Sequence, residues 1–320
     1  MLDEQEVAFC DEMRTFQDAA SDNPLVPGLL FSLSLDSPTL DSHVQAYSPR
    51  PLPLQHRHTG RTVSFQIVHA IQEGEDYHSQ VWLAKPVELK SDACLVFKFI
   101  VASHLPQKDE VPEEDYRSLD QVVANQLEPF ERLSFFQGSY LPWFYGVHEV
   151  IMPWNERGRL FVMEYIPAKF ESGFRGMDLE GYVRLFKTAM NVLDTAHKAC
   201  ITHGDIRLDN LLFDNADHSN GSHPGPRLVL IDWRNENKGD VRGSDLMTPF
   251  TIKKDIYDLY NAFADALYDL NASISHDLWL FNYRDFARRL YKDADIGERL
   301  NALRVAGPKL PDGFLESDSD

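Results

Sequence analysis

The sequence ITHGDIRLDNLLFD at residues 201–214, followed by RLVLIDWRNE at residues 227–236, decides the fold that we expect for this chain. Each segment contains a short apolar run, and the residues between the two runs are of the kinds that form turns. Two short apolar strands joined by such a connection predict a β-hairpin. The hairpin would bring Asp232, at the end of the second strand, beside Asn210, which precedes the first strand.

The polar residues of this predicted hairpin suit a site for magnesium and phosphate. Mg²⁺ prefers hard oxygen ligands, with one or two from the protein and the rest from phosphate and water. We therefore expect Asn210 and Asp232 to hold Mg²⁺. Asp205 precedes Asn210 on the same loop, where a base or orienting group for an attacking hydroxyl would lie. Arg207 lies between them and could neutralise a transferring phosphoryl group.

These residues resemble two motifs of the protein-kinase-like superfamily. HGDIRLDN at residues 203–210 is similar to its catalytic loop, H-x-D-x-x-x-x-N, and IDW at residues 231–233 is similar to its second magnesium motif. The resemblance implies ATP-dependent phosphoryl transfer with Mg²⁺, in which Asp205, Arg207 and Lys98 are the catalytic residues. The competing interpretation is an unrelated α+β fold whose charged loop residues match these motifs by chance.

Lys98 is the single charged residue in the strand that we expect at residues 95–100, LVFKFI. A lysine among apolar neighbours is costly unless its ammonium group has a partner. Its position resembles that of the kinase lysine that pairs with the α- and β-phosphates of ATP. The alternative is a lysine on an edge strand, with a buried aliphatic stem and an ammonium group in water.

The resemblance also implies where the nucleotide would bind. Gly74 and Val81 match the glycine-rich loop pattern GxGxxGxV, although the segment here reads GEDYHSQV. By the same resemblance, Met163 lines the back of the adenine pocket, and the backbone from Glu164 to Ile166 hydrogen-bonds the adenine edge. The expected cofactor-binding residues are Gly74, Val81, Val96, Lys98, Met163, Glu164, Ile166 and Leu212.

Departures from the family pattern support a second hypothesis, a pseudokinase that acts as a nucleotide-binding or protein-interaction scaffold without turnover. Asp76 and Ser79 replace two glycines that would let backbone amides approach phosphate. On the helix predicted at residues 116–133, Gln126 takes the place of the glutamate that pairs with the family's lysine. A glutamine can hydrogen-bond to a lysine but cannot form the ion pair.

The segment that follows Asp232 gives an indication of which molecule accepts the phosphoryl group. From Asp232 to Lys254 the chain is polar and short, and it lacks the A-P-E signature of protein kinases. In these respects it looks more like aminoglycoside- and choline-type small-molecule kinases, or divergent kinase-like proteins. The expected acceptor is therefore a hydroxyl group on a protein or on a small molecule.

Two residues near the loop resemble structural parts of the family. His203 would pack beneath the loop, and Asp255 would hold the loop backbone. For Asp255 the alternative is an exposed carboxylate in the first turn of a helix, which the helix dipole favours. His197, on the apolar face of the preceding helix, is expected to be a core histidine.

The resemblance implies an α+β, two-lobed protein-kinase-like fold, with a five-stranded antiparallel sheet in the N-lobe and a mainly helical C-lobe. In the first part of the chain, residues 2–20 could form an acidic helix. Residues 21–58 lack periodicity, which favours a linker or a loosely docked arm. The expected regions are an acidic, then Pro/Ser-rich N-terminal extension at 1–60, an N-lobe at 61–164, a C-lobe at 165–311 and an acidic tail at 312–320.

Hydrophobic periodicity places the individual elements. Asp178 is the expected N-cap of the long helix that leads into the catalytic loop. Strands are predicted at 62–71, 81–83, 95–100, 143–152 and 159–165. Helices are predicted at 116–133, 179–197, 253–269 and, as two helices, within 278–303.

The composition and the net charge of the chain disfavour some classes of function. The 320 residues are 43% hydrophobic and 25% charged, as in ordinary globular proteins, and the formal net charge is −19. So acidic a chain disfavours nucleic acid and anionic membranes as partners. An acidic N-terminus and the absence of a long apolar run argue against a signal peptide and a membrane helix. We therefore expect an intracellular, cytoplasmic protein.

Overall fold

The computed structural model describes residues 2–38, 49–54, 60–74, 78–88, 93–167, 178–214, 227–234 and 249–272. The chain forms two compact units, Met1–Tyr165 and Ile166–Asp320. The helices expected within 278–303, the acidic tail and Asp76 lie outside the described residues.

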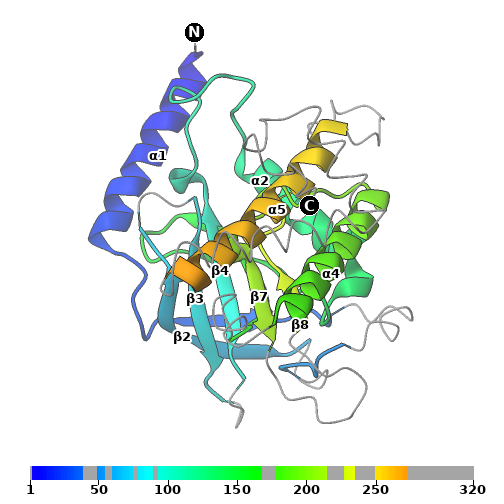
Figure 1. Ribbon diagram of the computed structural model, residues 1–320. Coiled ribbons are helices and arrows are strands. Elements are labelled where there is room, and N and C mark those ends of the chain that lie inside the picture. Colours follow the sequence, from blue (N-terminus) through cyan, green and yellow to red (C-terminus); the bar gives the residue numbers. More distant parts are fainter. Residues whose placement is uncertain are drawn as a thin grey trace, which may run out of the picture. The chain divides into compact units, whose positions relative to one another are not determined.

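The first unit contains a six-stranded sheet and two α-helices (Figure 1). The strands are β1 (Leu30–Ser34), β2 (Thr62–Gln72), β3 (Gln80–Pro86), β4 (Leu95–Val101), β5 (Phe144–Ile151) and β6 (Arg157–Glu164). The helices are α1 (Glu4–Asp22) and α2 (Leu119–Arg132). Every strand pair is antiparallel, in the spatial order β1-β2-β3-β4-β6-β5. The strands predicted at 62–71, 81–83, 95–100, 143–152 and 159–165 are confirmed as β2, β3, β4, β5 and β6.

The sheet curls into a nearly closed barrel, and side chains from the inward faces of its strands form one hydrophobic core. Phe65, Ile67 and Phe97 are fully buried in the core that the inward faces share. The two edges of the sheet meet just beyond β1, where the Asp36 N–H donates to the carbonyl of Tyr145 on β5 at 3.1 Å. Closure of this kind leaves little unpaired backbone at the edges.

Strand β1 lies in the stretch that was expected to be a linker or a docked arm, so that interpretation is wrong for these residues. Phe31, Leu33 and Leu35 alternate with polar or exposed residues, and their side chains are buried in the barrel core. This period of two is the sequence signal of a half-buried strand. The surrounding Pro- and Ser-rich sequence concealed it.

A buried ion pair fixes the end of the same stretch to the barrel. Arg50 donates from Nε to Glu164 Oε1 at 2.9 Å and from Nη2 to Glu164 Oε2 at 2.7 Å. Its guanidinium also donates to the carbonyls of Ser139 at 2.6 Å and Leu141 at 3.1 Å, and the Trp143 indole donates to the Arg50 carbonyl at 3.0 Å. Both charges are thus buried with hydrogen-bond partners, as burial of a charge requires.

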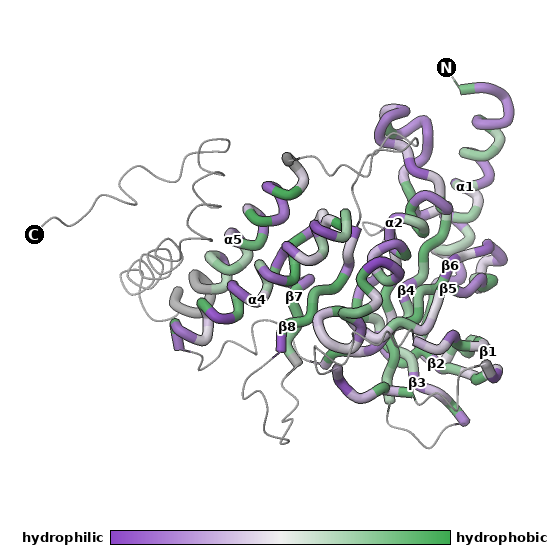
Figure 2. Tube along the Cα trace, turned by 90° about the vertical axis from the view of Figure 1, so that its right-hand side faces the viewer, coloured by the Kyte–Doolittle hydropathy of each residue, from purple (hydrophilic) through white to green (hydrophobic). Residues whose placement is uncertain are grey.

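The second unit combines two helices with a hairpin. They are α4 (Leu179–Lys198), β7 (Leu211–Asp214), β8 (Arg227–Leu230) and α5 (Pro249–Ala272). The predicted hairpin is confirmed, since β7 and β8 pair antiparallel with Leu211 opposite Leu230. Asp178 caps α4 by accepting from the Gly181 N–H at 2.8 Å, as predicted. Helices α4 and α5 pack side by side, and purple and green segments alternate along both in Figure 2, as in amphipathic helices.

The predicted two-lobed kinase-like architecture is wrong. In place of a five-stranded N-terminal sheet, the first unit has a six-stranded, nearly closed barrel. In place of a mainly helical C-lobe, the described part of residues 165–311 holds two α-helices together with a β-hairpin. The described residues contain four α-helices in all. The prediction placed most strands correctly but missed the strand that completes the barrel.

Candidate functional site

The hairpin of the second unit brings the predicted metal ligands to one place. Asn210 ends a short 3₁₀ turn, Leu208–Asn210, immediately before β7, and Asp232 follows β8. The Ile231 N–H donates to the carbonyl of Asn210 at 3.0 Å, which extends the pairing of the hairpin by one step. The backbones next to Asn210 and Asp232 are therefore hydrogen-bonded neighbours, as the sequence predicted.

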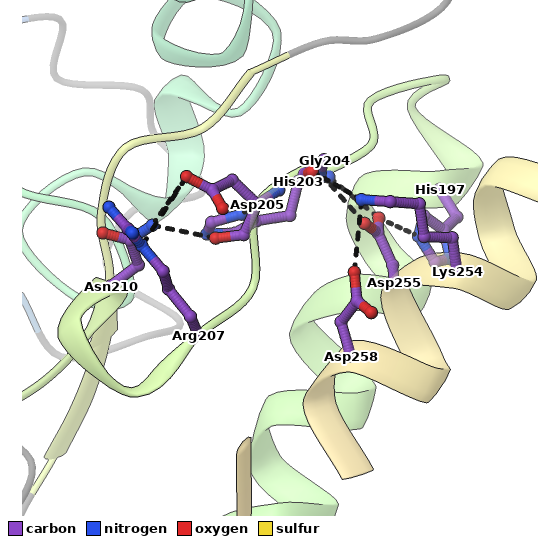
Figure 3. Close-up of polar contacts among 9 residues, drawn as sticks. All are labelled: His197, His203, Gly204, Asp205, Arg207, Asn210, Lys254, Asp255 and Asp258. Carbon is purple, nitrogen blue, oxygen red and sulfur yellow. Dashed lines mark hydrogen bonds and ion pairs between the residues drawn. The ribbon is translucent and has the colours of Figure 1, made fainter. Parts of the chain in front are cut away.

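Asp205 lies against the carboxamide of Asn210. The Asn210 Nδ2 donates to the Asp205 carbonyl at 2.8 Å and to Asp205 Oδ2 at 3.3 Å. The Arg207 Nε lies 3.8 Å from the same Asp205 Oδ2, and Figure 3 shows these three side chains grouped at one end of the loop. Because its nitrogen is committed to Asp205, the carboxamide of Asn210 retains its oxygen as an acceptor.

Asp232 has a left-handed backbone, with φ of 58°. This conformation is uncommon for a residue that carries a Cβ, and non-glycine residues held there concentrate at functional sites. Its side chain is 17% exposed. The strained backbone turns the chain directly after β8 and so determines where the next two residues lie.

The second of those residues, Arg234, belongs to the site although it was not predicted. Its Nη2 donates to Asp232 Oδ2 at 3.1 Å and lies 3.6 Å from Asp205 Oδ2. Its backbone N–H donates to the carbonyl of His203 at 2.8 Å. The IDWRNE sequence shows the arginine, but its spacing alone does not reveal that the side chain folds back onto both carboxylates.

Helix α5 holds the loop from the side opposite to Asn210 (Figure 3). Asp255 accepts from the backbone N–H of His203 at 2.8 Å and from that of Gly204 at 2.9 Å. Lys254 donates to the Gly204 carbonyl at 2.7 Å. The predicted structural role of Asp255 agrees with these contacts, whereas the alternative of an exposed carboxylate is wrong because Asp255 is buried.

Two histidines whose side chains are buried complete the set of contacts that hold the loop at His203 and Gly204. His197 on α4 shares the Asp255 carboxylate, with Nε2 at 2.9 Å from Oδ2, and since a carboxylate only accepts, His197 donates. His203 is fully buried beneath the loop, as expected, with its ring centroid 4.7 Å from that of Trp233. Trp233 belongs to the IDW motif that the sequence showed, but its contact with His203 was not predicted.

The surroundings shift two pKa values at this support. Burial lowers the pKa of His203 and outweighs the nearby carboxylates, chiefly Asp255, which raise it. For Asp255, burial raises the pKa, but the hydrogen bond from His197 and those from the backbone of the loop outweigh it, so its pKa lies below the ordinary value. The loop is therefore held by a charged aspartate above a neutral buried histidine.

The residues expected to contact the nucleotide from the first unit lie on its sheet. Val81 pairs with Lys98, and Val96 pairs with Met163, so these four side chains share one face of β3, β4 and β6. Lys98 is 8% exposed and lies on β4, which pairs with β3 on one side and β6 on the other, so it is not on an edge strand. Their roles in nucleotide binding stay predictions.

The other residues expected to bind the nucleotide are Gly74, Glu164, Ile166 and Leu212. Gly74 follows β2 with φ of 124°, which only glycine readily adopts. Glu164 directs its carboxylate to Arg50, and its N–H donates to the Trp143 carbonyl at 2.8 Å, so that N–H is already used. Ile166 and Leu212 lie in the second unit, where Leu212 is on β7.

The donors around the hairpin fit a hard divalent cation. The Asp232 carboxylate and the free carboxamide oxygen of Asn210 are oxygen ligands of the kind that Mg²⁺ takes when phosphate and water complete its shell. Within the described ranges, no group of three or more His, Cys, Asp and Glu side chains converges.

No family model matches this sequence, and no curated protein matches it significantly. Among the described helices, none combines the length and the apolar character needed to cross a membrane. The expected intracellular location stays a prediction.

Proposed function

We propose that this chain transfers the γ-phosphoryl group of ATP to a hydroxyl group on a protein or a small molecule. The observation that supports it most is the grouping of Asp205, Asn210 and Asp232 at one end of the hairpin. The resemblance of HGDIRLDN and IDW to kinase motifs gives these residues their roles. Asp255 on α5 holds the backbone of His203 and Gly204, directly before Asp205, which favours a loop that is organised before substrate binds.

In the proposed reaction the acceptor oxygen forms a bond to the γ-phosphorus, and the bond from that phosphorus to the β–γ bridging oxygen breaks. ADP leaves, and the proton of the acceptor hydroxyl passes to Asp205. The Asp205 side chain is 27% exposed, so an acceptor can reach it. Arg207, whose side chain is half exposed, would offset charge on the transferred group.

Asn210 and Asp232 would hold Mg²⁺, which neutralises charge on the phosphates when it is bound. The contribution of Lys98, which would orient the phosphates, is part of the proposal and is supported by the resemblance alone. The remaining work of the protein is positioning, because a well-placed acceptor and donor lose little entropy on the way to the transition state.

A thermal-shift titration with ATP, in the presence and absence of Mg²⁺, tests the proposal. Ligand that binds only the native state raises the stability, by about 2.7 kcal/mol at a ligand concentration of 100 times Kd. We expect a rise in Tm that requires Mg²⁺ and disappears in Asp232→Ala. Asp209→Ala is the matched control, because Asp209 is an exposed carboxylate on the same loop. No shift in the wild type at millimolar ATP would contradict the proposal.

A second candidate is a binding protein that retains nucleotide without turnover. Arg234 favours it, because a guanidinium already lies against both carboxylates that the reaction would use. Gln126, in place of the family's glutamate, points in the same direction. Slow hydrolysis of bound ATP, in which a water molecule takes the place of the acceptor hydroxyl, separates the two functions before the acceptor is identified. Release of ADP and inorganic phosphate that is lost in Asp205→Ala requires cleavage of the γ-phosphoryl bond at this site, whereas a scaffold would bind ATP and leave it intact.

A further inference from the structure

Arg234 presents one positive charge to two acidic side chains. The same nitrogen, Nη2, lies 3.1 Å from Asp232 Oδ2 and 3.6 Å from Asp205 Oδ2. The first distance is that of a charge-assisted hydrogen bond, and the second is within ion-pair range. The guanidinium therefore already offsets part of the charge that would attract a metal ion.

Arg234 has a fixed backbone and a side chain that can move. Its N–H is hydrogen-bonded to the His203 carbonyl, and the preceding Trp233 packs on the buried His203 ring. The side chain itself is 45% exposed, so it can leave the carboxylates and enter water at little cost in packing. Another cation can therefore replace the Arg234 guanidinium at the two carboxylates while the backbone of the loop stays in place.

A divalent cation and this guanidinium compete for the same oxygen. Oδ2 of Asp232 accepts from Arg234, and a metal ion at Asp232 would repel the guanidinium that lies beside it. We propose that Arg234 is the resident counter-cation of the Asp205–Asp232 pair and sets the metal affinity of the site. This inference rests on the proposed function, because it takes Asp232 as a metal ligand.

Competition has a thermodynamic consequence for how metal and nucleotide bind. A metal ion alone must displace Arg234 and so binds weakly. With nucleotide present, the phosphates supply negative charge that can pair with the released guanidinium, and metal binding becomes tighter. Because linkage is reciprocal, the metal increases the affinity for nucleotide by the same factor. Removal of the guanidinium should strengthen binding of the metal alone and reduce this coupling.

Titration of the full-length protein with Mn²⁺, followed by the electron paramagnetic resonance signal of the free ion, measures the first effect. We expect Arg234→Gln to bind Mn²⁺ about tenfold more tightly than the wild type, which corresponds to about 1.4 kcal/mol. Arg234→Lys keeps the charge and should lie nearer the wild type. Arg184→Gln, which removes an exposed charge from α4, should change nothing. Asp232→Asn should abolish binding in either background.

The outcomes separate this inference from the proposed function. Equal or weaker Mn²⁺ binding in Arg234→Gln overturns the inference, and a Mg²⁺-dependent ATP shift in the wild type would still support the proposed function. Tighter Mn²⁺ binding in Arg234→Gln, in a protein whose wild type shows no ATP shift, supports the inference and overturns the proposed function. Absence of Mn²⁺ binding from every variant overturns the inference.

Discussion

Buried His203 makes the stability of the second unit depend on pH. Its pKa is lowered in the folded protein below the unfolded value of 6.5. As the pH falls below 6.5, the unfolded chain takes up a proton that the folded chain refuses, so stability decreases towards the folded pKa. Burial of His203 thus decreases the free energy of unfolding only at acid pH.

We expect the free energy of unfolding in urea to rise between pH 5 and pH 6.5, with a slope that is smaller in His203→Gln. One proton contributes at most about 1.4 kcal/mol per pH unit. His69→Gln, at an exposed position, is the control for loss of an imidazole. If wild type and His203→Gln had the same slope, His203 would not be the group that the folded state keeps neutral.

At the residue scale, the sequence predicted the polar cluster but not all of its members. Asp205, Asn210 and Asp232 could be placed together because a hairpin has a simple geometry and the motif has a fixed spacing. Arg234 could not, because its position depends on the left-handed backbone of Asp232 and on a hydrogen bond to His203. Neither the backbone conformation nor the hydrogen bond produces a periodic pattern of residues that could be recognised in the sequence.

Among the elements, β1 decides the architecture of the first unit. It pairs with β2 along its whole length, from Leu30 opposite Gln66 to Ser34 opposite Thr62, and carries the chain to Asp36. There the chain meets β5, where Gly146 has φ of 103°. A Cβ at Gly146 would lie 2.2 Å from Asp36 Oδ2, so the Asp36 side chain would have to move to admit one.

Gly146→Ala should therefore destabilise the barrel more than an alanine placed at another glycine of similar backbone. Gly28 is the matched control, since its φ is 101° and a Cβ there would meet only Gln66 Nε2, at 3.9 Å. The two positions have similar positive φ values, whereas Gly146→Ala also forces the exposed Asp36 side chain to move beside the point where the barrel closes. We expect an additional loss of about 1 kcal/mol, measured by chemical denaturation. Equal losses would show that the Asp36 contact is dispensable.

The elements also show the limits of pattern recognition. Strand β2 follows alternation, β4 is a short apolar run, and α4 and α5 follow helical spacing, so these elements were predictable from local sequence. Strand β1 has the same alternation in only five residues, within a stretch rich in residues that favour loops. That it completes a barrel depends on partners far along the chain, which periodicity does not identify.

On the scale of the whole molecule, two compact units imply two sets of stabilising contacts. Residues separated by 114 positions form the Arg50–Glu164 pair, and both belong to the first unit. Removal of one member of a buried pair leaves an unpaired charge and costs about 3–5 kcal/mol. Proteins with more than one unit often unfold in more than one step.

Arg50→Met should therefore accelerate hydrogen exchange at β5 and β6 while α4 and the β7–β8 hairpin keep their protection. The double variant Arg50→Met/Glu164→Leu should recover part of the loss, because it removes the orphaned carboxylate. Arg157→Met, which removes an exposed partner of Glu149 at 3.8 Å, is the control and should have little effect. Uniform acceleration across both units would show that they unfold as one.

The hydrogen bond from Asp36 to Tyr145 also bears on how the protein avoids self-association. Open strand edges act as templates on which a second chain can add its own strand. In this barrel, β1 covers the edge of β2 and the chain beyond it meets β5. Proteolytic removal of the residues up to Asp36 would uncover the edge of β2, and a monomer trimmed in this way would recruit a neighbour's strand in place of its own.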